Sequence, residues 1–99
     1  MTRSMRVKVV YLGLVRSKVG KREEEYEVET GSTLSDLLNS LAETYGESLK
    51  GIFRPDEGNR LDPTFIATVN GRLRDPLRGG DVMLSTGDTV ALMTLISGG

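Results

Sequence analysis

The sequence of 99 residues is long enough for one small domain but too short to enclose a deep cleft. Its 13 basic and 14 acidic residues give a net charge of -1, which offers no electrostatic reason to expect a nucleic-acid or membrane partner. Cysteine and histidine are both absent, which excludes disulfides, thiolate or imidazole metal sites, cysteine nucleophiles and the Ser-His-Asp relay of many hydrolases.

The N-terminal residues alternate between charged and apolar types after Met5. Neither the apolar stretch of a signal peptide nor the longer one of a membrane span is recognisable there. We therefore expect a cytoplasmic protein without a membrane partner, folded as a single domain over residues 1–99.

The first predicted strand covers residues 6–11, where alternation places Val7, Val9 and Tyr11 on one face. Residues 13–22 hold two glycines and four basic residues, a composition typical of a loop. Alternation resumes over residues 24–28, which are predicted to form the second strand of a hairpin with a long tip. We interpret its glutamates as a charged sheet edge that resists aggregation, not as a metal site.

The period of the apolar residues changes to that of a helix after Thr33. Residues three and four apart form a single stripe, which predicts a helix packed on one face of a sheet. The stripe comprises Leu34, Leu37, Leu38, Leu41, Ala42 and Tyr45. Ser32 or Thr33 can cap the first turn, and Gly46 can supply the left-handed residue that ends the helix.

The C-terminal half predicts a surface excursion, a tight hairpin and a final strand. Residues 50–63 are rich in proline, glycine and charge, which is typical of a surface segment. Residues 64–69 lead into Asn70-Gly71, a favoured pair for a two-residue turn, and then into residues 72–73. The last strand is predicted over residues 89–96. This order indicates an α+β fold in which a mixed sheet wraps one helix, with the first and last strands as central neighbours.

The last strand is apolar on both faces. Its core-facing set is predicted to be Val90, Leu92 and Thr94. The opposite face needs a cover, so we predict a partner-binding surface made of Ala91, Met93, Leu95, Val10 and Leu12. The alternative is that a loop of the chain folds over this face.

The sequence ends on Gly98-Gly99, directly after this apolar strand. Because glycine has no Cβ, two glycines in succession can pass through a narrow channel and present a terminal carboxylate to an adenylating enzyme. We expect both glycines to be mobile in the free protein, since no apolar side chain anchors them. The alternative is a frayed terminus without a chemical role.

Several motifs occur in the order found in a known family: Val69-Asn70-Gly71-Arg72, then Gly87-Asp88 before the last strand, then Gly98-Gly99. The segments at residues 16–20 and 31–38 also fit. The chain resembles the ubiquitin-like sulfur carriers, which include the small subunit of molybdopterin synthase, the thiazole-synthesis carrier and the small archaeal modifiers. The resemblance covers nearly the whole chain and implies the ubiquitin-like β-grasp fold.

The resemblance implies that an activating enzyme adenylates Gly99 with ATP and that sulfur transfer then produces a thiocarboxylate, with Gly98 providing steric clearance. The sulfur would pass to the large subunit of molybdopterin synthase or to another sulfur-accepting enzyme, such as one in tRNA thiolation. Two alternatives stay open: a modifier conjugated through Gly99 to lysines of target proteins, and an interaction module whose tail is never activated. On each interpretation we expect a carrier or non-catalytic subunit that binds no metal or cofactor itself.

Overall fold

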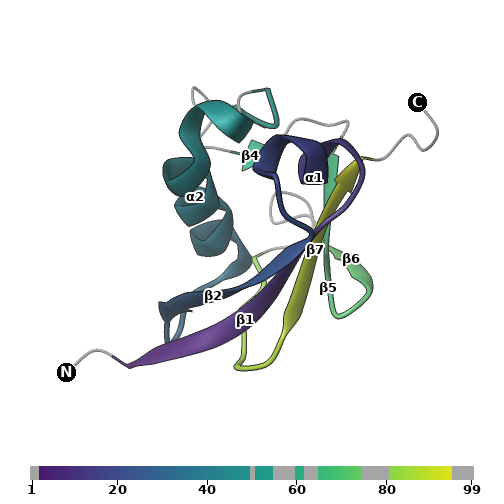
Figure 1. Cartoon of the computed structure of the whole chain (residues 1–99). Helices are drawn as coiled ribbons and strands as arrows, with labels where there is room; N and C mark the ends of the chain where they lie inside the picture. Colours follow the sequence, from purple (N-terminus) through teal and green to yellow (C-terminus); the bar gives the residue numbers. More distant parts are fainter. Residues whose placement is uncertain (1–2, 50, 55–59, 62–64, 75–80, 95–99) are drawn as a thin grey trace.

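The computed structural model describes residues 3–49, 51–54, 60–61, 65–74 and 81–94 of the chain. Its main feature is a five-stranded sheet in the order β2-β1-β7-β5-β6, with the helix α2 across one face (Figure 1). The strands are β1 Ser4–Tyr11, β2 Glu23–Glu29, β5 Phe65–Val69, β6 Arg72–Arg74 and β7 Thr89–Thr94. The predicted α+β class, with a mixed sheet around one main helix, is confirmed.

The first and last strands lie side by side in the middle of the sheet. This confirms the predicted neighbourhood of β1 and β7, which run parallel, while β1–β2, β5–β7 and β5–β6 are antiparallel pairs. The β5–β6 hairpin turns through Asn70 and Gly71, whose φ angles of 52° and 84° are those of the predicted two-residue turn. Because β7 is paired on both edges, it is held firmly before the chain continues toward Gly99.

The core lies between the sheet and α2 (Leu34–Tyr45). Alternate strand residues face it, and the buried ones are Met5, Val7, Val9, Tyr11, Val28, Ala67, Val69, Val90 and Leu92. The helix contributes the buried side chains of Leu34, Leu37, Leu38 and Leu41. Ala42 and Tyr45 are partly buried at the edge of the core. These positions confirm the helical stripe, the core face of the first strand and, at Val90 and Leu92, that of the last strand, while the side chain of Thr94 lies outside the described residues.

Identifiable hydrogen bonds mark both the start and the end of α2. The Thr33 hydroxyl accepts a hydrogen bond from the Asp36 amide at 3.3 Å, and the Asp36 carboxylate accepts one from the Thr33 amide at 2.9 Å. Of the two residues predicted to cap the helix, Ser32 and Thr33, the structure uses Thr33. At the other end the Gly46 amide donates to the Ala42 carbonyl, and Gly46 opens the short 3-10 helix η1 (Gly46–Leu49). Its φ of 42° is positive as predicted, but its ψ of -109° lies outside the left-handed helical region.

A second helix, α1 (Leu14–Val19), occupies the stretch predicted to be a loop. Gly20 ends this helix with φ 87°, and its amide donates to the Arg16 carbonyl oxygen at 2.8 Å. Val15 is fully buried and anchors the helix to the core. The loop prediction was wrong because a six-residue helix with a single buried side chain is too short to display a helical period.

The excursion after η1 also contains regular structure. β3 (Phe53–Arg54) pairs with β4 (Arg60–Leu61) in a separate two-stranded sheet. Ile52 just before it is fully buried, so this part of the predicted surface segment contributes to the core. Residues 55–59 and 62–64 lie outside the described residues. Within the described part of the chain, no helix is long and apolar enough to cross a membrane.

Candidate functional site

The register of β1 and β7 brings most of the predicted partner-binding residues together. Val10 lies opposite Ala91 across the parallel pair, and the Leu12 amide donates to the Leu92 carbonyl oxygen at 3.0 Å. Val10, Leu12, Ala91 and Met93 are all half-buried and lie on the face opposite α2, because their strand neighbours face the core. The structure thus assembles four of the five predicted residues on one surface. Whether a partner binds there stays a prediction.

The same surface extends onto strands that the sequence did not connect to it. Ile66 of β5 lies opposite Met93, and Thr68 lies opposite Ala91. Leu73 of β6 lies opposite Thr68, and 63% of its surface is exposed, one of the largest values for an apolar side chain of the described residues. We call this surface the outer apolar patch, and it comprises Val10, Leu12, Ile66, Thr68, Leu73, Ala91 and Met93. A contiguous apolar surface of this kind is characteristic of a binding face.

The other half of this sheet face is charged. Lys8 forms an ion pair with Glu23 at 3.0 Å, and Arg6 forms one with Glu25 at 3.4 Å. About half or more of each side chain is exposed, so each pair contributes at most about 1 kcal/mol. The charged side chains lie on β2 and the first part of β1 and reach Glu23, opposite Val10, whereas the outer apolar patch lies at the end of β1 on the side of β7. The apolar half is therefore the half from which β7 leads toward the diglycine.

The predicted reactive residues themselves lie beyond the described part of the chain. Thr94 is the last described residue, so Leu95, Gly98 and Gly99 fall outside it, as does the predicted mobility of the two glycines. What the structure defines is the base of this segment, which is a central strand bordered by the outer apolar patch.

The start of β7 is held by two of the motifs noted in the sequence. The Asn70 side chain donates to the Asp88 carboxylate at 2.9 Å and accepts from the Thr89 amide at 2.9 Å. Asp88 also accepts from the Ser85 amide at 2.8 Å. The two motifs are separated in the sequence but form one hydrogen-bonded junction. Its role is to fix where β7 begins relative to the β5–β6 hairpin.

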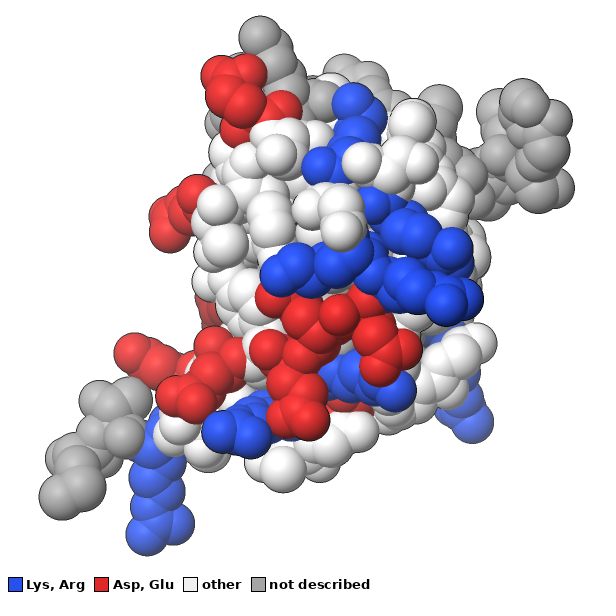
Figure 2. Space-filling view, viewed as in Figure 1, with Lys and Arg blue, Asp and Glu red and all other residues white. Residues whose placement is uncertain are grey.

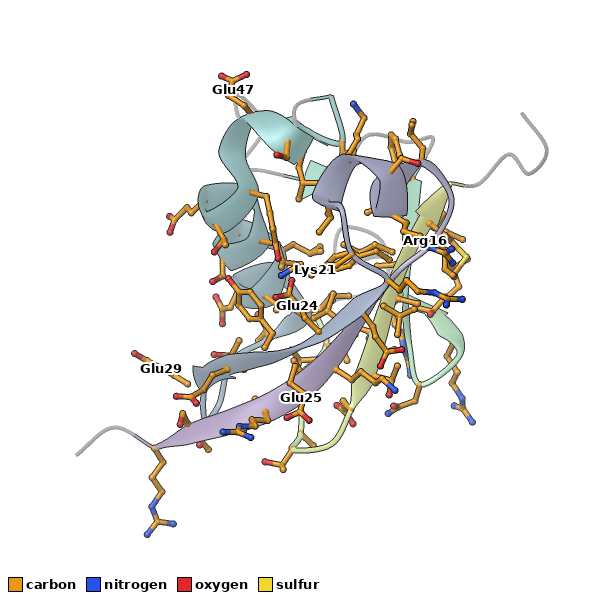
Figure 3. The ribbon with its side chains drawn as sticks, in the orientation of Figure 1. Arg16, Lys21, Glu24, Glu25, Glu29 and Glu47 are labelled. Atoms are coloured by element: carbon orange, nitrogen blue, oxygen red, sulfur yellow. The ribbon has the colours of Figure 1, made fainter. Side chains whose placement is uncertain are left out.

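The C-terminal end of β1, at Tyr11, carries a cluster of polar side chains (Figure 3). The Tyr11 hydroxyl donates to a Glu24 carboxylate oxygen at 2.5 Å, and the Tyr45 hydroxyl donates to the same oxygen. The Lys21 ammonium lies 3.4 Å from the other Glu24 oxygen and 5.8 Å from the centre of the Tyr45 ring. The cluster joins β1, β2 and α2 near the end of β7.

These contacts change the acidity of the groups involved. Burial alone would raise the pKa of Glu24, but the hydrogen bonds from Tyr11 and Tyr45 and the charge of Lys21 outweigh burial and hold this pKa below its ordinary value. Burial and the Glu24 carboxylate raise the pKa of the Tyr11 hydroxyl far above its ordinary value. The carboxylate is thus fully used inside the cluster, which indicates a structural role.

Sequence reasoning missed this cluster, the junction and the contribution of β5 and β6 to the patch. Neither Glu24 nor Tyr45 is distinctive in the sequence, since they meet only through the packing of α2 on the hairpin. The sequence did contain a hint of the junction, because Asn70 and Asp88 belong to two of the motifs shared with the sulfur-carrier family. No group of three or more acidic side chains that could hold a metal ion occurs among the described residues.

Comparisons with known proteins agree on one family. The ThiS family model matches residues 9–99. Small archaeal modifier protein 1 of Methanosarcina acetivorans is 27% identical, with a TM-score of 0.74 over 98% of this chain and 99% of that chain. A Pyrococcus furiosus protein described as molybdopterin converting factor, subunit 1, is 26% identical, with a TM-score of 0.72 over 93% of this chain and 99% of that chain. Small archaeal modifier protein 1 of Haloferax volcanii, at 19% identity, supports the fold, with a TM-score of 0.75 over 93% and 99%. A search of curated proteins finds no significant match.

Proposed function

Because this chain belongs to the ThiS family of ubiquitin-like sulfur carriers and modifiers, we propose that it is a sulfur carrier whose reactive group is the carboxylate of Gly99. The observation that carries this proposal is the family match, which runs through the final diglycine. The described structure supports it, because β7 leads toward that diglycine from the middle of the sheet, beside the outer apolar patch.

The proposed chemistry takes place in two steps on a partner. A Gly99 carboxylate oxygen attacks the α-phosphorus of ATP, so that an acyl-adenylate forms and pyrophosphate leaves. A sulfide-level sulfur donor then attacks the carbonyl carbon, a carbon–sulfur bond forms and AMP leaves. Gly98 contributes steric clearance, since a side chain there would narrow the approach to the phosphate. The general acids and bases belong to the partner, which is consistent with a chain that has neither histidine nor cysteine.

We propose that the outer apolar patch is the docking surface for the adenylating enzyme. Met93 is the central residue, because it lies between Ile66 on one side and the segment of Leu12 on the other. Its flexible thioether suits a surface that meets more than one partner in turn, such as an activating enzyme and then a sulfur-accepting enzyme. The patch positions the domain, and the diglycine reaches the active site.

The test is incubation with ATP, a sulfide donor and the adenylating enzyme of the same organism, followed by intact-mass measurement. We expect the mass to rise by the difference between one sulfur and one oxygen atom. The chain lacking Gly99 should still bind the enzyme but should show no mass change, since its carboxylate no longer reaches the phosphate. An unchanged mass for the full chain, with an enzyme that modifies its own carrier, would refute the proposal.

The names of two relatives favour a second candidate function. The Pyrococcus protein is named as a molybdopterin converting factor, which suits a sulfur carrier. The Methanosarcina protein is named as a modifier. In the modifier alternative, a lysine amine of a target protein attacks the acyl-adenylate, AMP leaves and an isopeptide bond forms. The same mass measurement distinguishes them, because a series of larger conjugates indicates a modifier. The accepting pathway, molybdopterin synthesis or tRNA thiolation, is tested by adding each sulfur-accepting enzyme separately.

A further inference from the structure

Four basic residues are concentrated within seven positions of the chain. Arg16 and Lys18 lie in the last turn of α1, and Lys21 and Arg22 follow in the turn before β2. The Arg22 carbonyl oxygen accepts a hydrogen bond from the Tyr11 amide at 2.8 Å, which ties this turn to the end of β1. Figure 2 shows basic atoms gathered over this region, above the acidic atoms.

The four side chains differ in whether their charged groups already have a partner within the domain. Lys21 is paired with Glu24, and the half-buried Arg16 donates to the Tyr11 carbonyl oxygen at 3.4 Å. Lys18 and Arg22 are exposed, and neither forms an ion pair with another described residue. These two cations are therefore available to an outside partner.

The segment that carries the two cations lies next to Leu12, a residue of the outer apolar patch. α1 packs against β7, and Figure 3 shows Arg16 of this helix next to the upper part of that strand. Leu12, a patch residue, lies two positions before the helix begins. The glutamates of β2 lie along β1 from Ser4 to Val10, and the ion pairs with Arg6 and Lys8 engage Glu25 and Glu23. The segment of residues 14–22, which carries both cations, thus lies at the end of β1 where the outer apolar patch lies and from which β7 leads toward the diglycine.

We propose that Lys18 and Arg22 form a basic rim that pairs with acidic side chains on the protein that takes up the diglycine tail. This inference rests on the proposed function and specifies the chemistry of the partner, an apolar surface with an acidic border. A protein fits better than a nucleic acid, because an apolar surface lies next to the segment that carries the rim and the net charge of the chain is -1. Opposite charges at such a border act mainly by accelerating encounter.

The first test measures ATP-dependent modification by the adenylating enzyme at low and high KCl. The double variant Lys18→Glu/Arg22→Glu should raise KM about 10-fold at low salt and leave kcat nearly unchanged, because steering affects encounter rather than chemistry. The difference should shrink at high salt. The matched control is Arg3→Glu/Arg6→Glu, with the same change of charge at the start of β1, about 25 Å from its end. Equal KM values for the two double variants would overturn the inference.

The second test does not depend on the proposed function. The ¹⁵N-labelled protein is titrated with an octaglutamate peptide, an octalysine peptide and a single-stranded RNA octamer. We expect octaglutamate alone to shift the amides of Lys18 and Arg22, in a salt-sensitive manner that the double variant abolishes. Tighter binding of the RNA, or no response to octaglutamate, would overturn the inference. If the wild-type chain is not modified at all, the proposed function fails, and this titration still shows whether Lys18 and Arg22 bind acidic side chains.

Discussion

At the scale of single residues, the junction between Asn70 and Asp88 shows how a short motif acquires a structural meaning. Asn70 has a φ of 52°, which asparagine tolerates better than most residues, and its side chain also makes two hydrogen bonds. Asn70→Ala should therefore lower the free energy of unfolding by about 1–3 kcal/mol in urea titrations. Asn70→Gly restores the backbone freedom but not the hydrogen bonds, so it should recover only part of this loss. Full recovery by glycine would show that the hydrogen bonds contribute nothing.

Glu24 makes stability depend on pH in a defined direction. Its pKa is held below the ordinary value of 4.5, so at pH values below 4.5 the unfolded chain takes up a proton before the folded one does. The stabilisation is therefore complete above pH 4.5 and is lost as the pH falls through the folded pKa. In urea titrations across this range, the stability advantage of the wild type over Glu24→Gln should decrease with acid. An advantage that is constant with pH would contradict the assigned interactions.

At the scale of the elements, the sequence predicted those with a long enough period and missed the short ones. α2 shows three turns of a regular stripe, and the strands alternate clearly, so their positions follow from the residues alone. α1 offers only Val15 as a buried side chain, and β3 and β4 have two residues each. Such elements form because the surrounding core holds them, which no local pattern reports.

The apolar stripe of α2 gives the clearest prediction at this scale. Leu38 is 4% exposed between the helix and the sheet, and Leu38→Ala would leave a cavity there. The free energy of unfolding should fall by about 2–5 kcal/mol. Glu43→Ala on the exposed side of the same helix serves as the control and should change stability by less than about 0.5 kcal/mol. Similar losses for the two variants would mean that the helix does not pack as described.

At the scale of the whole molecule, the sequence predicted the part of the candidate site that lies on the last strand and on the neighbouring first strand. Ala91 and Met93 followed from the two apolar faces of the last strand. Ile66 and Leu73 could not be assigned, because their place depends on the register of β5 against β7 and of β6 against β5. The pairing of strands distant in sequence is a property of the assembled sheet.

The separation of docking from chemistry is testable on the intact domain. Met93→Glu should weaken binding to the adenylating enzyme by at least about 10-fold, since a charge would be desolvated in the middle of the interface. Its free energy of unfolding should change little, because the side chain lies on the outer face. Ser4→Glu places the same charge on the charged half of that face and should leave binding unchanged. Unfolding of the Met93 variant would show that this side chain belongs to the core.

The pairing of β7 on both edges also determines how the domain responds to a pulling force. An enzyme that draws in the residues after Thr94 pulls β7 along its own length. The hydrogen bonds to β1 and β5 run across this direction, so they bear the load together, whereas a strand peeled from a sheet edge loses its bonds one at a time. A partner can therefore hold the tail tightly without unravelling the domain that carries it.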